Sequence, residues 1–60
     1  MTFQDAMAQT FSFRSLAAAR SFVANGIRGL CIVLGDNGMY WVSTRRAVGW
    51  LVANGYTYAV

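Results

Sequence analysis

The chain has 60 residues, of which 57% are hydrophobic and 12% are charged, and its net charge of +3 comes from arginine and aspartate alone. One cysteine and no histidine exclude an intrachain disulfide and a zinc site built from cysteine or histidine, and no cofactor is expected. A domain this small is marginally stable by itself and usually needs a disulfide, a metal or an oligomer. The composition therefore predicts a homodimer.

The N-terminus indicates a short helix followed by a strand. Residues 1–9 form an arm in which Phe3, Ala6 and Met7 have helical spacing. Residues 10–14 then alternate polar and aromatic side chains, as a half-buried strand does.

A first helix is predicted over residues 16–25. Ser15 is a suitable N-cap, and apolar residues recur on one helical face. The Asn-Gly pair at 25–26 is a typical stop signal, because glycine tolerates the left-handed conformation after a helix. We therefore expect a positive φ at Gly26.

A hairpin follows the first helix. Residues 27–34 are apolar and β-branched and predict a buried strand. The sequence does not show which of the two faces of this strand is directed toward the helices. The Gly-Asp-Asn-Gly sequence at 35–38 is typical of a tight turn. Residues 39–43 supply the partner strand.

The second half of the chain repeats this plan. Ser43 or Thr44 caps a second helix that ends at the Asn-Gly pair at 54–55, and residues 56–60 form the last strand. We expect Gly55 to share the positive φ of a helix C-cap.

The tripeptide Ala-Asn-Gly occurs at 24–26 and again at 53–55, an offset of 29 residues that also pairs Phe22 with Leu51. A self-match at a constant offset predicts an internal repeat. The single domain, 1–60, would then consist of an arm at 1–9, a first βαβ unit at 10–38 and a second at 39–60.

The element order β-α-β-β-α-β is that of a split βαβ fold, and it resembles small ferredoxin-like domains. The resemblance implies an α+β fold with a four-stranded antiparallel sheet, and right-handed crossovers would place both helices on one face of it. The other sheet face would stay open.

Enzyme chemistry is not expected. The chain has no histidine, glutamate or lysine, so a nucleophile has no obvious general base. Asp5 and Asp36 lie in the arm and in a turn, and Cys31 lies within a strand, where a thiol acts as a small hydrophobic group.

The open sheet face is the first candidate surface. Alternation in the strands would place polar and aromatic side chains on it. Such a face suits a homodimer packed sheet on sheet, or alternatively a platform for single-stranded nucleic acid, with bases stacked on aromatic rings and an arginine on phosphate. Its predicted residues are Arg14, Met39, Trp41, Tyr56 and Tyr58.

A second candidate surface lies on the second helix. Arg46 and Trp50 are four residues apart, where side chains of a helix can touch. The equivalent positions of the first helix are Ala17 and Ser21, so only one copy carries a cation and a large aromatic ring. Tryptophan and arginine are common interface anchors, and together with Arg45 they predict a partner-binding patch.

These features favour a small, non-enzymatic module that binds another cellular or host protein. In size the chain resembles phage or mobile-element inhibitors such as anti-CRISPR proteins. Single-stranded nucleic-acid binding is the alternative. The longest apolar run is far below the ~18 residues of a membrane-spanning helix, and the first residues lack the features of a signal peptide, so we expect a cytoplasmic protein without membrane contact.

Overall fold

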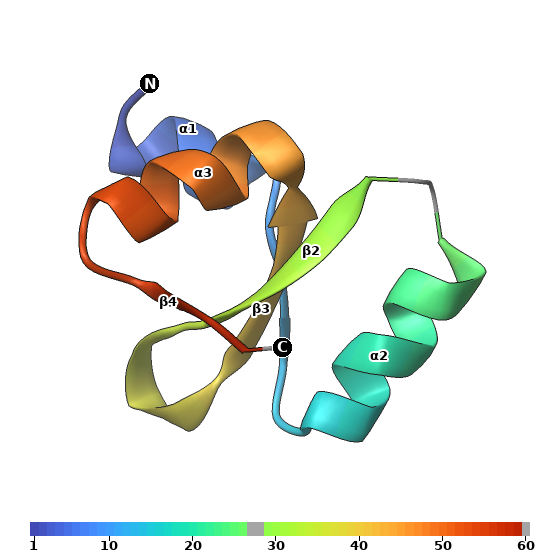
Figure 1. Cartoon of the computed structure of the whole chain (residues 1–60). Helices are drawn as coiled ribbons and strands as arrows, with labels where there is room; N and C mark the ends of the chain where they lie inside the picture. Colours follow the sequence, from blue (N-terminus) through green and yellow to red (C-terminus); the bar gives the residue numbers. More distant parts are fainter. Residues whose placement is uncertain (27–28, 60) are drawn as a thin grey trace.

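The computed structural model describes residues 1–26 and 29–59, which form an antiparallel sheet of four strands with three α-helices around it (Figure 1). The α+β class and the four-stranded antiparallel sheet are therefore confirmed. No helix in this part of the chain is long and apolar enough to cross a membrane. In chain order the elements are α1 (Phe3–Ala8), β1 (Phe11–Phe13), α2 (Leu16–Asn25), β2 (Leu30–Leu34), the short helix η1 (Asp36–Gly38), β3 (Tyr40–Thr44), α3 (Arg45–Ala53) and β4 (Thr57–Tyr58).

Hydroxyl side chains begin the two longer helices. Ser15 accepts a hydrogen bond from the Ala18 N–H at 3.1 Å, and Thr44 accepts one from the Ala47 N–H at 3.3 Å. Each hydroxyl satisfies a backbone donor that has no partner within its helix. The predicted cap at Ser15 is confirmed, and Thr44 rather than Ser43 caps α3.

The N-terminal arm is an ordered helix packed on the core. Thr2 and Asp5 form a reciprocal capping box, with the Thr2 N–H donating to the Asp5 carboxylate at 3.0 Å. These hydrogen bonds hold the pKa of Asp5 below its usual value. Ala6 is fully buried. The buried Ser43 hydroxyl accepts from the Thr10 hydroxyl at 3.0 Å and donates to the Gln9 carbonyl at 3.2 Å, which ties the end of α1 to β3.

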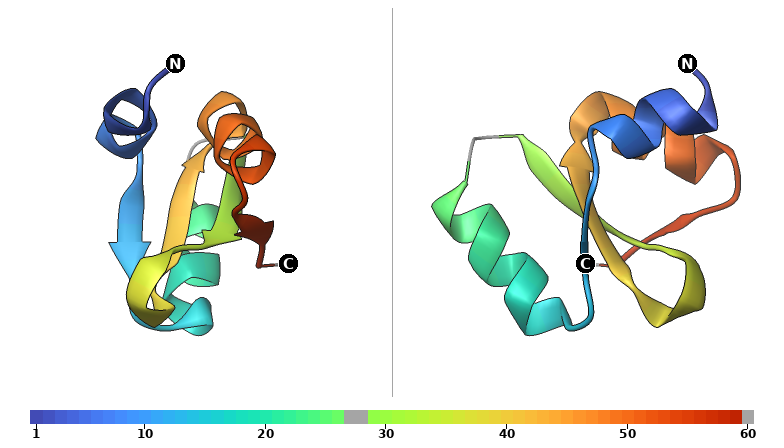
Figure 2. Two further views of the ribbon diagram at one scale, coloured as in Figure 1. Left: turned by 90° about the vertical axis from the view of Figure 1, so that its left-hand side faces the viewer. Right: turned by 180° about the vertical axis from the view of Figure 1, so that it is seen from behind.

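The two longer helices lie on opposite faces of the sheet, so the prediction that they share one face is wrong (Figures 1 and 2). Ile32 and Val42 pack with Ala19 of α2. Their strand neighbours Val33 and Trp41 point the other way and pack with α1 and α3. The sheet is covered on both sides.

Strand order explains this arrangement. The order is β1-β3-β2-β4, so β4 pairs with β2 and not with β1. The two crossovers, from β1 to β2 and from β3 to β4, therefore run in the same direction across the sheet. Because β3 is antiparallel to β1, right-handed connections then place α2 and α3 on opposite faces.

The two halves agree only in part. β1 and β3 begin 29 residues apart, as do α2 and α3, whereas β4 begins 27 residues after β2. The internal repeat stays a prediction. The start of the predicted strand at 27–34 and the end of the one at 56–60 lie outside the described residues.

The two helix-terminating glycines differ. Gly55 has φ 106°, which confirms its expected left-handed conformation. Gly26 has φ −101°, so the expectation of a positive φ there is wrong. A Cβ on Gly26 would instead lie 2.8 Å from the Phe22 carbonyl oxygen, so close approach of the backbone favours glycine at this position.

Candidate functional site

The predicted patch on α3 is only partly a free surface. Arg45 and Arg46 are exposed in the first turn of the helix. Trp50 is half-buried and packs, as Met7 of α1 does, against the core between these helices and the sheet. Trp50 therefore contributes to packing, and its use in binding stays a prediction.

The five residues predicted for an open sheet face do not share one. Trp41 is only 5% exposed, and its ring centroid lies 6.2 Å from that of Phe3 and 5.2 Å from that of Tyr56. Met39 and Tyr56 are half-buried against the same cluster. The prediction of an open face is wrong because α1 and α3 cover it. Two of the five are exposed, Arg14 just after β1 and Tyr58 on β4.

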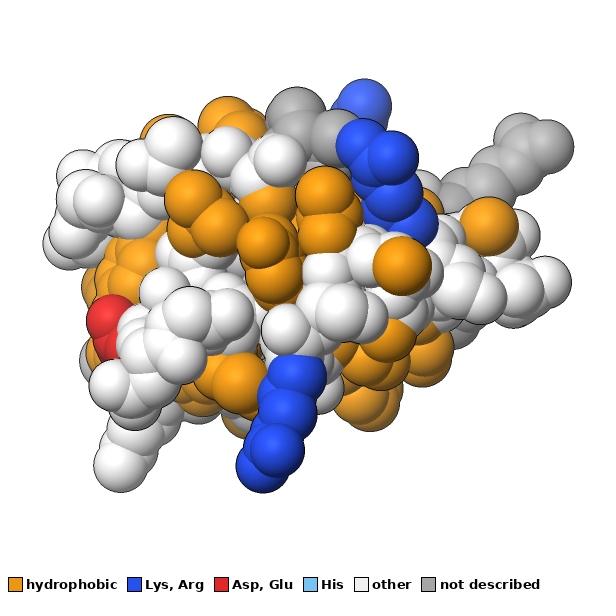
Figure 3. Space-filling view, turned by 90° about the horizontal axis from the view of Figure 1, so that it is seen from below, with side chains coloured by type: hydrophobic (Ala, Val, Ile, Leu, Met, Phe, Trp, Pro, Cys, Tyr) orange, Lys and Arg blue, Asp and Glu red, His pale blue; other side chains and the backbone are white. Residues whose placement is uncertain are grey.

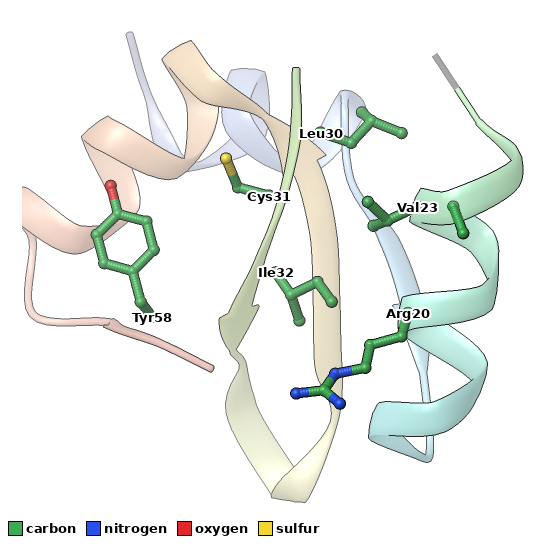
Figure 4. Close-up of a pocket in the computed structure, with 7 residues that line it drawn as sticks. Arg20, Val23, Leu30, Cys31, Ile32 and Tyr58 are labelled. Atoms are coloured by element: carbon green, nitrogen blue, oxygen red, sulfur yellow. The ribbon is translucent and has the colours of Figure 1, made fainter. Parts of the chain in front are cut away.

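An apolar groove that the sequence did not reveal lies between α2 and β2 (Figure 4). It has a volume of about 520 Å³. Leu30 and Ile32 project from β2 toward α2, whereas Cys31 projects to the side of Tyr58, so the strand itself forms the floor (Figure 4). The residues that line the groove are Arg20, Val23, Ala24, Leu30, Cys31, Ile32 and Tyr58.

The groove lies beside the part of β2 that does not pair with β4. β4 pairs with Val33 and Leu34, and the Ala59 N–H extends this pairing by donating to the Ile32 carbonyl at 3.1 Å. Alternate residues of a strand direct their backbone groups to the same edge. The backbone N–H and carbonyl of Leu30 are therefore directed to the same edge as those of Ile32. Within the described chain no strand lies beside Leu30 on this edge.

Charge around the groove is positive. Arg20 is exposed and reaches from α2 toward β2, close to Ile32 (Figure 4). Neither aspartate lines the groove, since Asp5 lies in α1 and Asp36 lies in η1.

Seen from below, the molecule presents broad hydrophobic areas, with arginine side chains beside them and little acidic surface (Figure 3). An apolar groove next to a guanidinium suits an apolar ligand that carries a carboxylate.

The groove is lined mainly by apolar side chains. Its polar side chains are a guanidinium, a thiol and a phenol, and Tyr58 and Arg20 come from different elements on opposite sides of β2. No three metal-ligating side chains come together among residues 1–26 and 29–59. An open strand edge between an apolar helix and a tyrosine is typical of sites that receive extended peptides.

Sequence reasoning missed the groove because its main determinant is the pairing of β4 with β2 over so few residues, which depends on contacts between distant parts of the chain. One signal was present. The strand around residues 30–34 is apolar on both faces, which indicated that each face needs a cover. Comparison of the chain with protein-family models, with curated proteins and with solved structures finds no match.

Proposed function

We propose that this chain is a non-enzymatic protein-binding module, and that the groove between α2 and β2 receives an extended segment of a partner protein. The observation that supports this proposal is that no strand among residues 1–26 and 29–59 pairs with β2 at Leu30, where an apolar wall lies beside it. Main-chain hydrogen bonds to such an edge supply affinity, and pockets for alternate side chains supply specificity.

The dimensions of the site suit a short segment. The edge from residue 29 to residue 31 spans about 10 Å at about 3.3 Å per residue, so about three residues of a partner would pair with it. Because side chains alternate along a strand, every second guest residue would face α2. There Val23, Ala24 and Ile32 offer aliphatic contacts. Arg20 favours an acidic residue two positions from the aliphatic one, on the same face of the guest strand.

A titration with a synthetic peptide tests this function. The probe is acetyl-Thr-Val-Thr-Glu-Thr-Val-Thr-amide, in which both valines and the glutamate share one face, and the readout is the shift of backbone amide resonances in the ¹⁵N-labelled protein. We expect shifts to concentrate on Leu30, Cys31, Ile32 and the second half of α2. The control peptide has the same sequence with alternate amides N-methylated, which removes the donors that a strand edge requires.

A pair of variants locates the binding. Ala24→Phe fills the groove from an exposed position of α2, and Ala17→Phe adds the same bulk to an exposed position of α2 outside the groove. Ala24→Phe should weaken binding at least tenfold, while Ala17→Phe should leave it unchanged. Equal binding by the two peptides, or equal effects of the two variants, would refute the proposal.

The inhibitor role and the α3 patch stay predictions. Arg45→Ala with Arg46→Ala should leave peptide binding in the groove unchanged, because both residues lie on α3 and neither lines the groove. The nucleic-acid alternative is tested by titration with oligothymidine. Its affinity would fall steeply with salt through counterion release, whereas binding in an apolar groove responds little.

A further inference from the structure

We infer that a second copy of this chain pairs along β1, so that the two sheets join into one across a two-fold axis at Ser12. β1 and β4 form the two edges of the sheet (Figure 2, left), and the peptide groove lies on the side of β2 and β4. The inference therefore stands independently of the proposed function.

The backbone of Ser12 faces away from the sheet. The Ala59 hydrogen bond shows that Ile32 directs its carbonyl toward β4, so Val33 directs its backbone groups toward β3. The backbone N–H and carbonyl of its partner Trp41 are then directed toward β2. Those of the residues on either side of Trp41 in β3 are directed toward β1. Because those residues pair with Phe11 and Phe13, Ser12 directs its N–H and carbonyl outward.

The strand is self-complementary about this residue. The sequence Phe11-Ser12-Phe13 is the same in both directions, so antiparallel pairing about a two-fold axis places each phenylalanine opposite the other from the second copy. Ser12 meets Ser12, and the N–H of each donates to the carbonyl of the other. Arg14 meets Thr10, so no like charges are opposed.

Of the two phenylalanines at this edge, Phe11 is exposed and Phe13 is half-buried. Phe11 is 55% exposed, and its ring centroid lies 5.0 Å from that of Phe22, which in turn lies 5.1 Å from that of Phe13. Pairing two copies brings two such clusters together on the α2 side of a continuous sheet. A short, exposed, aromatic edge strand is the kind that pairs with another chain.

Sedimentation velocity and light scattering of the whole protein test the inference. The parent should be a dimer at micromolar concentration, twice the 6.6 kDa chain mass. Ser12→Pro removes the outward donor without touching a bond to β3, and proline is tolerated at such edge positions. It should yield a folded monomer, as should Phe11→Glu. Leu34→Glu, a control at another exposed apolar residue of the sheet, should stay dimeric.

Cross-linking places the axis even if a variant fails to fold. With Cys31→Ser as background, a short bis-thiol-reactive cross-linker should join Ser12→Cys into a covalent dimer, because directly paired residues of antiparallel strands lie about 5.5 Å apart. It should not join Ala17→Cys. A monomeric parent, or a dimer that survives Ser12→Pro and dissociates on Ala24→Phe, would overturn the inference; the second result would place the second copy in the groove.

Discussion

Replacing Gly35 with alanine would place a methyl group where the indole of Trp41 already lies. The added Cβ would stand 2.2, 2.4 and 2.5 Å from the Cε2, Cδ2 and Nε1 atoms of that ring. Ordinary contacts between such atoms begin near 3.4 Å, so the ring would have to retreat by about 1 Å. It has little room, because Phe3 and Tyr56 pack against it and it is 5% exposed.

The expected loss of stability follows from this contact. Overpacking a core costs about 1–3 kcal/mol. Gly35 has φ −92°, which alanine adopts without strain, so alanine recovers about 0.4–1 kcal/mol through the unfolded chain. The net destabilisation is about 1–2 kcal/mol, and for a domain of this size each kcal/mol lowers Tm by about 4–8 °C.

Circular dichroism and tryptophan fluorescence during heating measure this loss. Gly49→Ala is the matched control, since its Cβ meets nothing within 4 Å and it lies inside α3, where alanine favours the helix by about 1 kcal/mol. We expect Gly35→Ala to melt about 4–16 °C below the parent and Gly49→Ala to melt above it. If Gly35→Ala melts with the parent, Trp41 does not pack on the backbone at Gly35 and the described core is wrong.

Three further predictions concern turns, buried polar groups and pH. Gly55→Ala should cost about 1 kcal/mol in urea denaturation, because φ 106° disfavours a side chain although the space around it is empty; an unchanged midpoint would contradict the left-handed turn. Ser43→Ala should cost about 0.5–1.5 kcal/mol by removing the hydrogen bonds that its buried hydroxyl makes with Thr10 and Gln9, and Ser43→Thr is the comparison that keeps the hydroxyl. Partial burial and the hydrogen bond to Asp36 raise the pKa of Tyr56 above its usual 10.0. The folded state is therefore stabilised by protonated Tyr56 below about pH 10, and this contribution to the free energy of unfolding is lost as pH rises through the raised pKa. Tyr56→Phe should show less alkaline loss of stability than the parent, and identical pH profiles would refute the link.

Local features of the fold followed well from the sequence. The cap at Ser15, the turn at residues 35–38 and the stop at Gly55 each depend on groups only a few residues apart. The hairpin of β2 and β3 was predicted for the same reason. Such features are decided by the chemistry of one short stretch, and they are insensitive to the rest of the chain.

The placement of α3 did not follow, because it depends on which edge of the sheet β4 joins. Among the described residues near Tyr58, two are paired strand residues, and nothing in them distinguishes β2 from β1 as a partner. The burial of Trp41 was missed for a related reason: the arm around Phe3 covers it from a distant part of the chain. The groove at Leu30 is a consequence of the same non-local pairing, so it could not be predicted either.

The two-residue pairing of β4 also divides the amides of β2 into two kinetic classes. The N–H groups of Ile32 and Leu34 are directed toward β4, whereas those of Cys31 and Val33 are directed toward β3, whose pairing with β2 covers five residues. Detaching β4 breaks few contacts, and detaching β3 dismantles the sheet. Hydrogen exchange along β2 should therefore alternate, with fast deuteration at even-numbered residues and slow deuteration at odd-numbered ones. Each opening of β4 lengthens the stretch of β2 that no strand pairs with. The exchange rate of the even-numbered amides therefore measures how often β2 can pair with a longer guest strand.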